Sequence, residues 1–172
     1  FYGSNFTKVT IGDSVTKIGN YTFYNCTSLT SVTIPDSVTT IGERAFCNCN
    51  SLKSVTIPDS VTKIGDYAFY GCTGELIVNG DIPSASTSES GAFYGSNFTK
   101  VTIGDSVAKI GNYAFEDCDS LKSVTIGDSV IKIGNYAFYD CTSLTSVTIP
   151  NSVTTIGKMA FWGCDSLTSV TI

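Results

Sequence analysis

Valine recurs every 23 residues along the whole chain, and this spacing constrains the fold more than any other feature of the sequence. An isoleucine stands two residues after each of these valines, except where Gly80 replaces it. The valines are Val9, Val32, Val55, Val78, Val101, Val124, Val147 and Val170. The segment Phe1–Val9 also recurs at Phe93–Val101, a shift of four such units. A fixed period of about 20 to 50 residues is typical of solenoids, in which each unit packs only on its neighbours.

One unit, residues 29–49, predicts a strand, a turn and a return segment. In Leu29–Ile34 apolar residues alternate with Ser and Thr, which is typical of a strand with one buried face. Pro35–Ser37 has the composition of a turn. The spacing of Ala, Phe and Cys in Ala45–Cys49 predicts a short helical or 3₁₀ turn. About seven inward apolar positions per unit cannot close a core alone, so we expect the units to stack into one solenoid of about seven coils over residues 1–172.

The unit L-x-S-V-T-I-P-D-S-V-T-x-I-G-x-x-A-F-x-x-C at Leu29–Cys49 resembles the 23-residue leucine-rich repeat of the BspA-like surface proteins of bacteria and protists. The resemblance covers essentially the whole chain. It implies an α/β repeat fold: a leucine-rich-repeat solenoid with a parallel β-sheet on one face and short strands and helical or 3₁₀ turns on the other. It also implies a cell-surface or secreted protein with a role in adhesion and host-protein binding.

Residues 73–92 keep the count of the repeat and lose its pattern. Glu75–Ile82 alternates in polarity and predicts a strand longer than its neighbours, or a bend at Asn79–Asp81 within it. Pro83–Ser90 is polar and predicts a surface loop, either structural or binding. Neither end of the chain has the polar unit that caps a solenoid, so we expect a piece of a longer array, with end-to-end self-association as one possible property.

Composition excludes several classes of function. The chain contains no histidine, which removes Ser-His-Asp and Cys-His nucleophiles and histidine-based zinc sites. Its net charge of −5 argues against nucleic acid as a partner, since nucleic-acid binding needs clustered Lys and Arg. The longest apolar runs are far shorter than a membrane span requires, so no direct membrane insertion is expected. We therefore predict that the chain is not an enzyme and takes no cofactor.

Cysteines and acidic residues form columns that have simple structural explanations. The cysteine column predicts small buried side chains that fill one core position, whereas Cys47 lies outside it and is predicted to be an exposed, reactive thiol. One aspartate per turn is too few oxygens for calcium, and turn chemistry explains it. Glu116, Asp117 and Asp119 are expected to form a solvated acidic edge. The cysteine column contains Cys26, Cys49, Cys72, Cys118, Cys141 and Cys164, and the aspartate column Asp13, Asp36, Asp59, Asp105 and Asp128.

Two aromatic columns, three residues apart in the unit, are the candidate binding residues. The first contains Tyr21, Tyr67, Tyr113 and Tyr136, and the second contains Tyr24, Tyr70, Tyr94, Tyr139 and Trp162. An i, i+3 spacing on a helical turn would place both columns on one side, and Tyr and Trp dominate binding hot spots. The structural alternative is that these rings only cover the edge of the core. The outward Ser and Thr rows of the strands are a second candidate surface.

These features favour a non-enzymatic binding or adhesion module that engages a protein or a glycan through repeated surfaces, with avidity along the rod. Two alternatives stay open. The chain could be a structural spacer or filament segment that presents other domains, or an accessory module of a larger enzyme.

Overall fold

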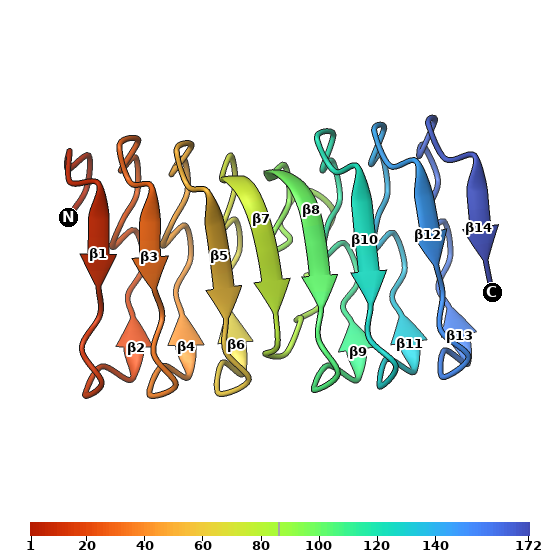
Figure 1. The fold of residues 1–172 in the computed structure, drawn as a ribbon, viewed down its shortest axis with the longest axis horizontal. Helices are drawn as coiled ribbons and strands as arrows, with labels where there is room; N and C mark the ends of the chain where they lie inside the picture. The colour runs from red at the N-terminus through yellow and green to blue at the C-terminus, as the bar shows by residue number, and fades with distance from the viewer. Residues whose placement is uncertain (86) are drawn as a thin grey trace.

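The computed structural model describes residues 1–85 and 87–172, which wind into one parallel solenoid (Figure 1). The longer strands lie on one side: β1 (Lys8–Thr10), β3 (Ser31–Thr33), β5 (Ser54–Ile57), β7 (Thr73–Val78), β8 (Asn97–Ile103), β10 (Ser123–Ile126), β12 (Ser146–Thr148) and β14 (Ser169–Thr171). Two-residue strands lie on the other side: β2 (Lys17–Ile18), β4 (Thr40–Ile41), β6 (Lys63–Ile64), β9 (Lys109–Ile110), β11 (Lys132–Ile133) and β13 (Thr155–Ile156).

The 23-residue period is the register of the long sheet. Val124 of β10 lies opposite Val101 of β8 and Val147 of β12, each one repeat away. The valines and isoleucines of the inner strands point into the core and are buried, whereas the Ser and Thr between them are largely exposed. Each unit therefore buries its apolar side chains against identical neighbours, as the sequence predicts.

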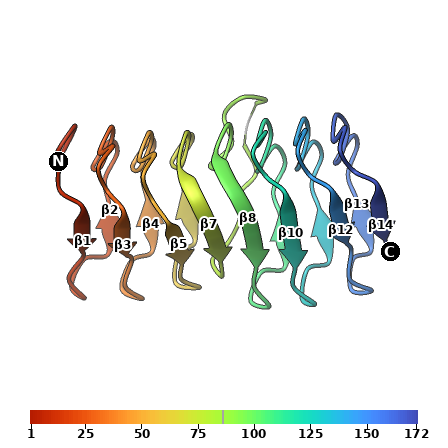
Figure 2. The ribbon, with the colours of Figure 1, turned by 45° about the horizontal axis from the view of Figure 1, so that its top comes forward.

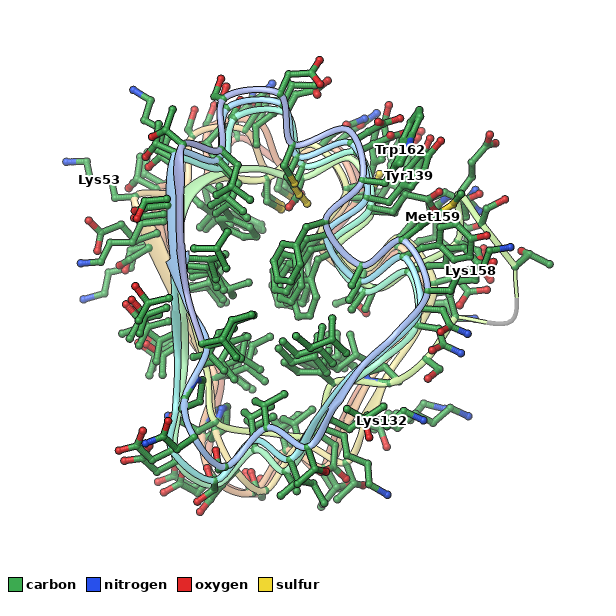
Figure 3. The ribbon with its side chains drawn as sticks, turned by 90° about the vertical axis from the view of Figure 1, so that its right-hand side faces the viewer. Lys53, Lys132, Tyr139, Lys158, Met159 and Trp162 are labelled. Atoms are coloured by element: carbon green, nitrogen blue, oxygen red, sulfur yellow. The ribbon has the colours of Figure 1, made fainter. Side chains whose placement is uncertain are left out.

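The core consists of columns of identical side chains along the solenoid axis (Figure 3). The phenylalanine column runs through the whole structure, and its rings stack at centroid distances of 4.8 to 5.6 Å. Each inner ring contacts a ring above and a ring below, so one unit alone could not build this core. The column contains Phe1, Phe23, Phe46, Phe69, Phe93, Phe115, Phe138 and Phe161.

The expected helical or 3₁₀ turns are absent from the described residues, and that part of the fold prediction is wrong. In the segment Asn20–Cys26, Tyr21 and Asn25 both have φ of 56°. The backbone N–H groups of Tyr21 and Phe23 donate to carbonyls of the next coil, at 2.9 and 2.7 Å. A right-handed helix needs negative φ at each residue, so the left-handed residues limit this segment to separate turns, in which Tyr24 N–H donates to Tyr21 O and Cys26 N–H donates to Phe23 O. The fold is therefore a parallel β-solenoid, closed by hydrogen-bonded turns, rather than an α/β repeat.

β7, the strand of the irregular unit, pairs with β5 in a register that differs by two residues from the one that the 23-residue spacing predicts. Leu76, not Val78, lies opposite Val55, and Val78 lies opposite Ile57. A bulge between Gly74 and Glu75 then adjusts the pairing with β8. A shift of two residues keeps every side chain on its face of the sheet, so the alternating pattern could not reveal it.

A close approach of two backbones at Gly74 accompanies this register. Gly74, with φ of 92°, lies opposite Phe98, and a Cβ at Gly74 would come within 2.3 Å of the carbonyl oxygen of Lys53. The ring of Phe98 is fully buried and lies 6.4 Å from the ring of Phe69. A glycine beside a large phenylalanine thus occupies the position where regular neighbouring coils have two leucines.

After β7 the chain bends at Gly80, so the predicted bend is confirmed. β7 ends at Val78 and not at the predicted Ile82, although its six residues make it longer than the four-residue β5. The segment between β7 and β8 then rises above the neighbouring coils (Figure 2). The expected polar loop at Pro83–Ser90 lies in this segment, and its Ser86 falls outside the described residues. Between β6 and β9 the described residues form no short strand, so the second side is divided into β2-β4-β6 and β9-β11-β13. No helix in the described part of the chain has the length and hydrophobicity that crossing a membrane requires.

Candidate binding surface

The predicted aromatic residues lie together along one edge of the solenoid, in the turns that follow the short strands. In the view along the axis, Tyr139 and Trp162 lie on this edge, and Lys53 projects from the sheet on the opposite side (Figure 3). We call this surface the aromatic edge; it contains Tyr21, Tyr24, Tyr67, Tyr70, Tyr94, Tyr113, Tyr136, Tyr139 and Trp162. Trp162 is 54% exposed, and the tyrosines are exposed or half-buried.

The turn brings the two aromatic columns into contact, although it is not helical. Tyr21 and Tyr24 have ring centroids 5.6 Å apart, as do Tyr136 and Tyr139. Between coils, Tyr113 stacks on Tyr136 at 5.0 Å, and Tyr139 stacks on Trp162 at 4.9 Å. The rings therefore support one another in fixed orientations, both within a coil and along the solenoid.

Interruptions in the columns divide the aromatic edge into three groups. Arg44 and Cys47 occupy the tyrosine positions after the first group, and Gly91 and Glu116 occupy them after the second. The N-terminal group contains Tyr21 and Tyr24, the middle group Tyr67, Tyr70 and Tyr94, and the C-terminal group Tyr113, Tyr136, Tyr139 and Trp162. Within the described residues no ring pair joins the middle and C-terminal groups.

Sequence reasoning missed four members of this surface. Tyr2 is 67% exposed and stacks on Tyr24 at 5.0 Å. Because the segment Phe1–Val9 recurs at Phe93–Val101, Tyr2 is equivalent to Tyr94. Met159 is exposed at the position of the first tyrosine column. Two cations also lie against the rings. The guanidinium carbon of Arg44 is 4.4 Å from the ring centroid of Tyr67, and Lys158 Nζ is 5.9 Å from that of Tyr136.

The acidic residues beside the C-terminal group are only partly as expected. Asp119 is exposed and accepts a 2.8 Å hydrogen bond from Thr142 Oγ1. Glu116, expected in solvent, is only 6% exposed, and its carboxylate accepts a 2.7 Å hydrogen bond from the backbone N–H of Glu89 in the irregular unit. Burial, and then the charges of Asp117, Glu89 and Asp140, raise the pKa of the Glu116 carboxyl above its ordinary value.

Two hollows lie in this part of the edge. One, of about 720 Å³, is lined by residues that include Tyr70, Tyr94 and Asp119. The other, of about 540 Å³, is lined by residues that include Tyr113, Tyr139 and Glu116. Asp117 and Asp140 line both hollows, so carboxylates and aromatic rings share one surface.

Comparison with known proteins agrees with the repeat and the solenoid. The family model of the BspA type leucine rich repeat region matches residues 1–89 and 86–172, in six copies. The chain belongs to the BspA-type leucine-rich repeat family. A comparison with curated proteins found no match.

Solved structures of bacterial leucine-rich repeat proteins are similar to this chain. One from Eubacterium ventriosum is 32% identical, with a TM-score of 0.78, over 92% of this chain and 43% of that one. One from Bacteroides capillosus is 31% identical, with a TM-score of 0.50, over 69% of this chain and 75% of that one. A leucine rich cell surface protein from Faecalibacterium prausnitzii is 27% identical, with a TM-score of 0.42, over 95% and 59%. The chain thus spans less than half of the first of these proteins.

Within this leucine-rich repeat, the cysteine column fills the core, as predicted. Its members are buried and free, and most of the thiols contact a phenylalanine carbonyl of an earlier coil, as Cys72 Sγ does with Phe46 at 3.0 Å. The prediction of an exposed, reactive Cys47 is wrong. Cys47 is 4% exposed, and burial raises the pKa of its thiol to about 11. It occupies a tyrosine position of the second aromatic column, where its short side chain is buried although it is not part of the apolar core.

The other candidate columns have the properties of turns and of an exposed sheet. Asp105 Oδ1 accepts a 3.0 Å hydrogen bond from the N–H of Asp128 in the next coil, which is turn chemistry. Within the described residues no group of three or more His, Cys, Asp or Glu side chains is arranged to hold a metal ion. The Thr row of the long sheet, including Thr125 and Thr148, is exposed on the side opposite the aromatic edge.

Proposed function

We propose that this chain is a non-enzymatic binding or adhesion module of a cell-surface or secreted protein, and that it engages a protein or glycan through the aromatic edge. The location follows from the family resemblance and is part of the proposal. The expected end-to-end association also stays a prediction, which light scattering over a range of concentrations tests.

The observation that carries the proposal is the backbone conformation at the first tyrosine column. Tyr21, Tyr67, Tyr113 and Tyr136 have φ between 54° and 56°. Left-handed φ costs a bulky residue on the order of 1–2 kcal/mol, whereas glycine, asparagine and aspartate tolerate it.

A second left-handed position in the same turns shows what the backbone itself favours. Four residues later, Asn25, Asn48, Gly71 and Asp140 have φ of 54° to 68°. These are the residue types that left-handed backbone accepts. Because the tyrosine column departs from this preference, backbone conformation does not explain its tyrosines. Stacking contributes roughly 0.5–1.5 kcal/mol per ring pair. This is about as large as the backbone strain, so stacking offsets the strain and leaves little net gain in stability. The exposed ring surface therefore supports a binding role.

The arrangement also suits binding energetically. Stacked rings are already held in one orientation, so a partner would not have to order them at an entropic cost of about 0.5–1.5 kcal/mol per side chain. Repetition of the surface along the solenoid multiplies weak contacts through avidity.

The test is a binding screen of the full-length protein against extracellular proteins and glycans, followed by two double variants. Tyr113→Asn with Tyr136→Asn removes two rings and leaves a residue suited to the left-handed backbone, so the fold should be kept. Thr125→Ala with Thr148→Ala is the matched control on the sheet. We expect the tyrosine variant alone to weaken binding, by about tenfold or more. Loss of binding only in the threonine variant would assign the function to the sheet, and no binding above background would refute the proposal.

A further inference from the structure

The second aromatic column has one gap that a carboxylate occupies. Tyr70 and Tyr94 stack at 6.1 Å before the gap, and Tyr139 and Trp162 stack at 4.9 Å after it. Between them lies Glu116, whose carboxylate accepts a hydrogen bond from the backbone N–H of Glu89 and lines the hollow there. Coils lie about 4.8 Å apart, so Tyr94 and Tyr139 flank the gap at roughly 10 Å. That separation leaves about 5 Å on each side of one flat group placed midway, which is close to the 4.9 Å between the stacked rings of Tyr139 and Trp162.

The first aromatic column has a gap of the same kind, and a cation fills it. Arg44 stands between Tyr21 and Tyr67, from the coils before and after it, with its guanidinium carbon 5.9 and 4.4 Å from their ring centroids. Arg44 Nη1 donates a 3.0 Å hydrogen bond to Tyr21 Oη and forms an ion pair with Glu43. The molecule therefore already holds a guanidinium between two tyrosines beside a carboxylate.

At the second gap the carboxylates are present and the cation is not. Asp117 and Asp140 stand next to Glu116 and Tyr139, with Asp119 and Asp165 nearby. In the described part of the chain, ion pairs form only at Arg44–Glu43 and Lys100–Glu75, away from this cluster. Burial, and then repulsion from Asp117, Asp119 and Asp165, raise the pKa of the Asp140 carboxyl. The local charge is thus uncompensated.

The backbone does not require these charges. Asp117 and Asp140 occupy the left-handed position that Asn25 and Asn48 occupy in the N-terminal coils, where the two amides form a 2.9 Å hydrogen bond. Asparagine would satisfy the same conformation without charge. The acidic character of the C-terminal coils is therefore additional to what the turn needs.

We propose that Tyr94, Glu116, Asp117, Tyr139 and Asp140, here called the acidic notch, bind a basic side chain of a protein partner, arginine before lysine. A planar guanidinium stacks on tyrosine faces and pairs with carboxylates through two N–H groups at once, which an ammonium does not. Complementary charge also favours this partner over a neutral glycan. This inference rests on the proposed function, because it names the class of partner for part of the aromatic edge.

The test uses the full chain and an Arg-Gly repeat peptide, with the matching Lys-Gly peptide and a neutral oligosaccharide as comparison ligands. Trp162, the single tryptophan, stacks on Tyr139 and serves as the fluorescence reporter. We expect the arginine peptide to bind most tightly and to bind more weakly as salt is added. Asp117→Asn with Asp140→Asn should weaken it by about tenfold.

The control is Asp105→Asn with Asp128→Asn, which makes the same change in charge in the aspartate column, where Asn151 already occupies one coil. Circular dichroism checks that both double variants stay folded. Equal weakening by the two variants would mean nonspecific attraction to an acidic protein and would overturn the inference. Preference for the oligosaccharide, or no peptide binding, would also overturn it. If the screen still finds a partner that depends on Tyr113 and Tyr136, only this inference fails; if the screen finds none, the proposed function fails.

Discussion

Replacing Val124 by aspartate tests the division of each strand into an inward and an outward face. Val124 is 6% exposed, lies between Val101 and Val147 in the long sheet, and belongs to the apolar core. The variant loses about 1.5–3 kcal/mol of side-chain burial. Its carboxyl must also be neutral to stay inside. Protonating it at pH 7, about three pH units above its ordinary pKa, costs about 4 kcal/mol.

The expected loss is therefore about 6 kcal/mol at pH 7, a large part of the stability of an ordinary domain. The second term has a pH signature. Burial raises the pKa of the new carboxyl in the folded state, so the folded state binds the proton more tightly and the loss shrinks as pH falls. At pH 4 we expect about 2–3 kcal/mol, since about half of the carboxyl is then protonated in the unfolded chain as well and the cost of protonation falls to roughly 0.5 kcal/mol.

Urea unfolding followed by circular dichroism at both pH values measures these losses. Thr125→Asp is the matched control, because Thr125 is the next residue and is exposed. Thr125→Asp should change the free energy of unfolding by no more than about 1 kcal/mol, which is the range over which residue types differ in their preference for a β-strand. If Val124→Asp does not fold at pH 7, Val124→Thr reports the same face at a cost of roughly 1–3 kcal/mol. Equal losses at Val124 and Thr125 would refute the inward assignment.

Three further predictions follow from the packing and the charges. Gly74→Ala should cost more than about 2 kcal/mol in urea unfolding, because of its φ of 92° and a clash with a backbone carbonyl, whereas Gly12→Ala, which meets nothing within 4 Å, should cost little. Cys47 should resist thiol reagents at neutral pH in the folded protein; rapid labelling seen by mass spectrometry would contradict its burial. The raised pKa values of Glu116 and Asp140 mean that the folded state binds their protons more tightly, so melting temperature should rise as pH falls from 7 towards their ordinary values, and Asp140→Asn should reduce this rise.

The irregular unit and the turns are the parts of the fold that could not be predicted correctly from the sequence. The alternation in β7 is compatible with two registers that differ by two residues, because both keep Leu76 and Val78 inside. The observed register brings Gly74 close to the backbone of Lys53 in the preceding coil, a contact between coils that the alternation does not reveal. The spacing of Ala, Phe and Cys suits a helical turn equally well, and the left-handed φ of residues such as Arg44 and Asn48 excludes a continuous right-handed helix.

The sequence by itself determined the solenoid, its 23-residue coil, the inward face of each strand and the two aromatic columns. It could do so because each coil contacts copies of itself, so one period in the chain becomes one contact repeated in space. The tertiary structure alone decided that Cys47 and Glu116 are buried and that the tyrosines have left-handed backbone. It also decided which rings contact one another and that Asp117 and Asp140 line two hollows beside them. These properties depend on how a residue that departs from the repeat packs between the two neighbouring coils. The spacing of residues in the sequence does not describe that packing.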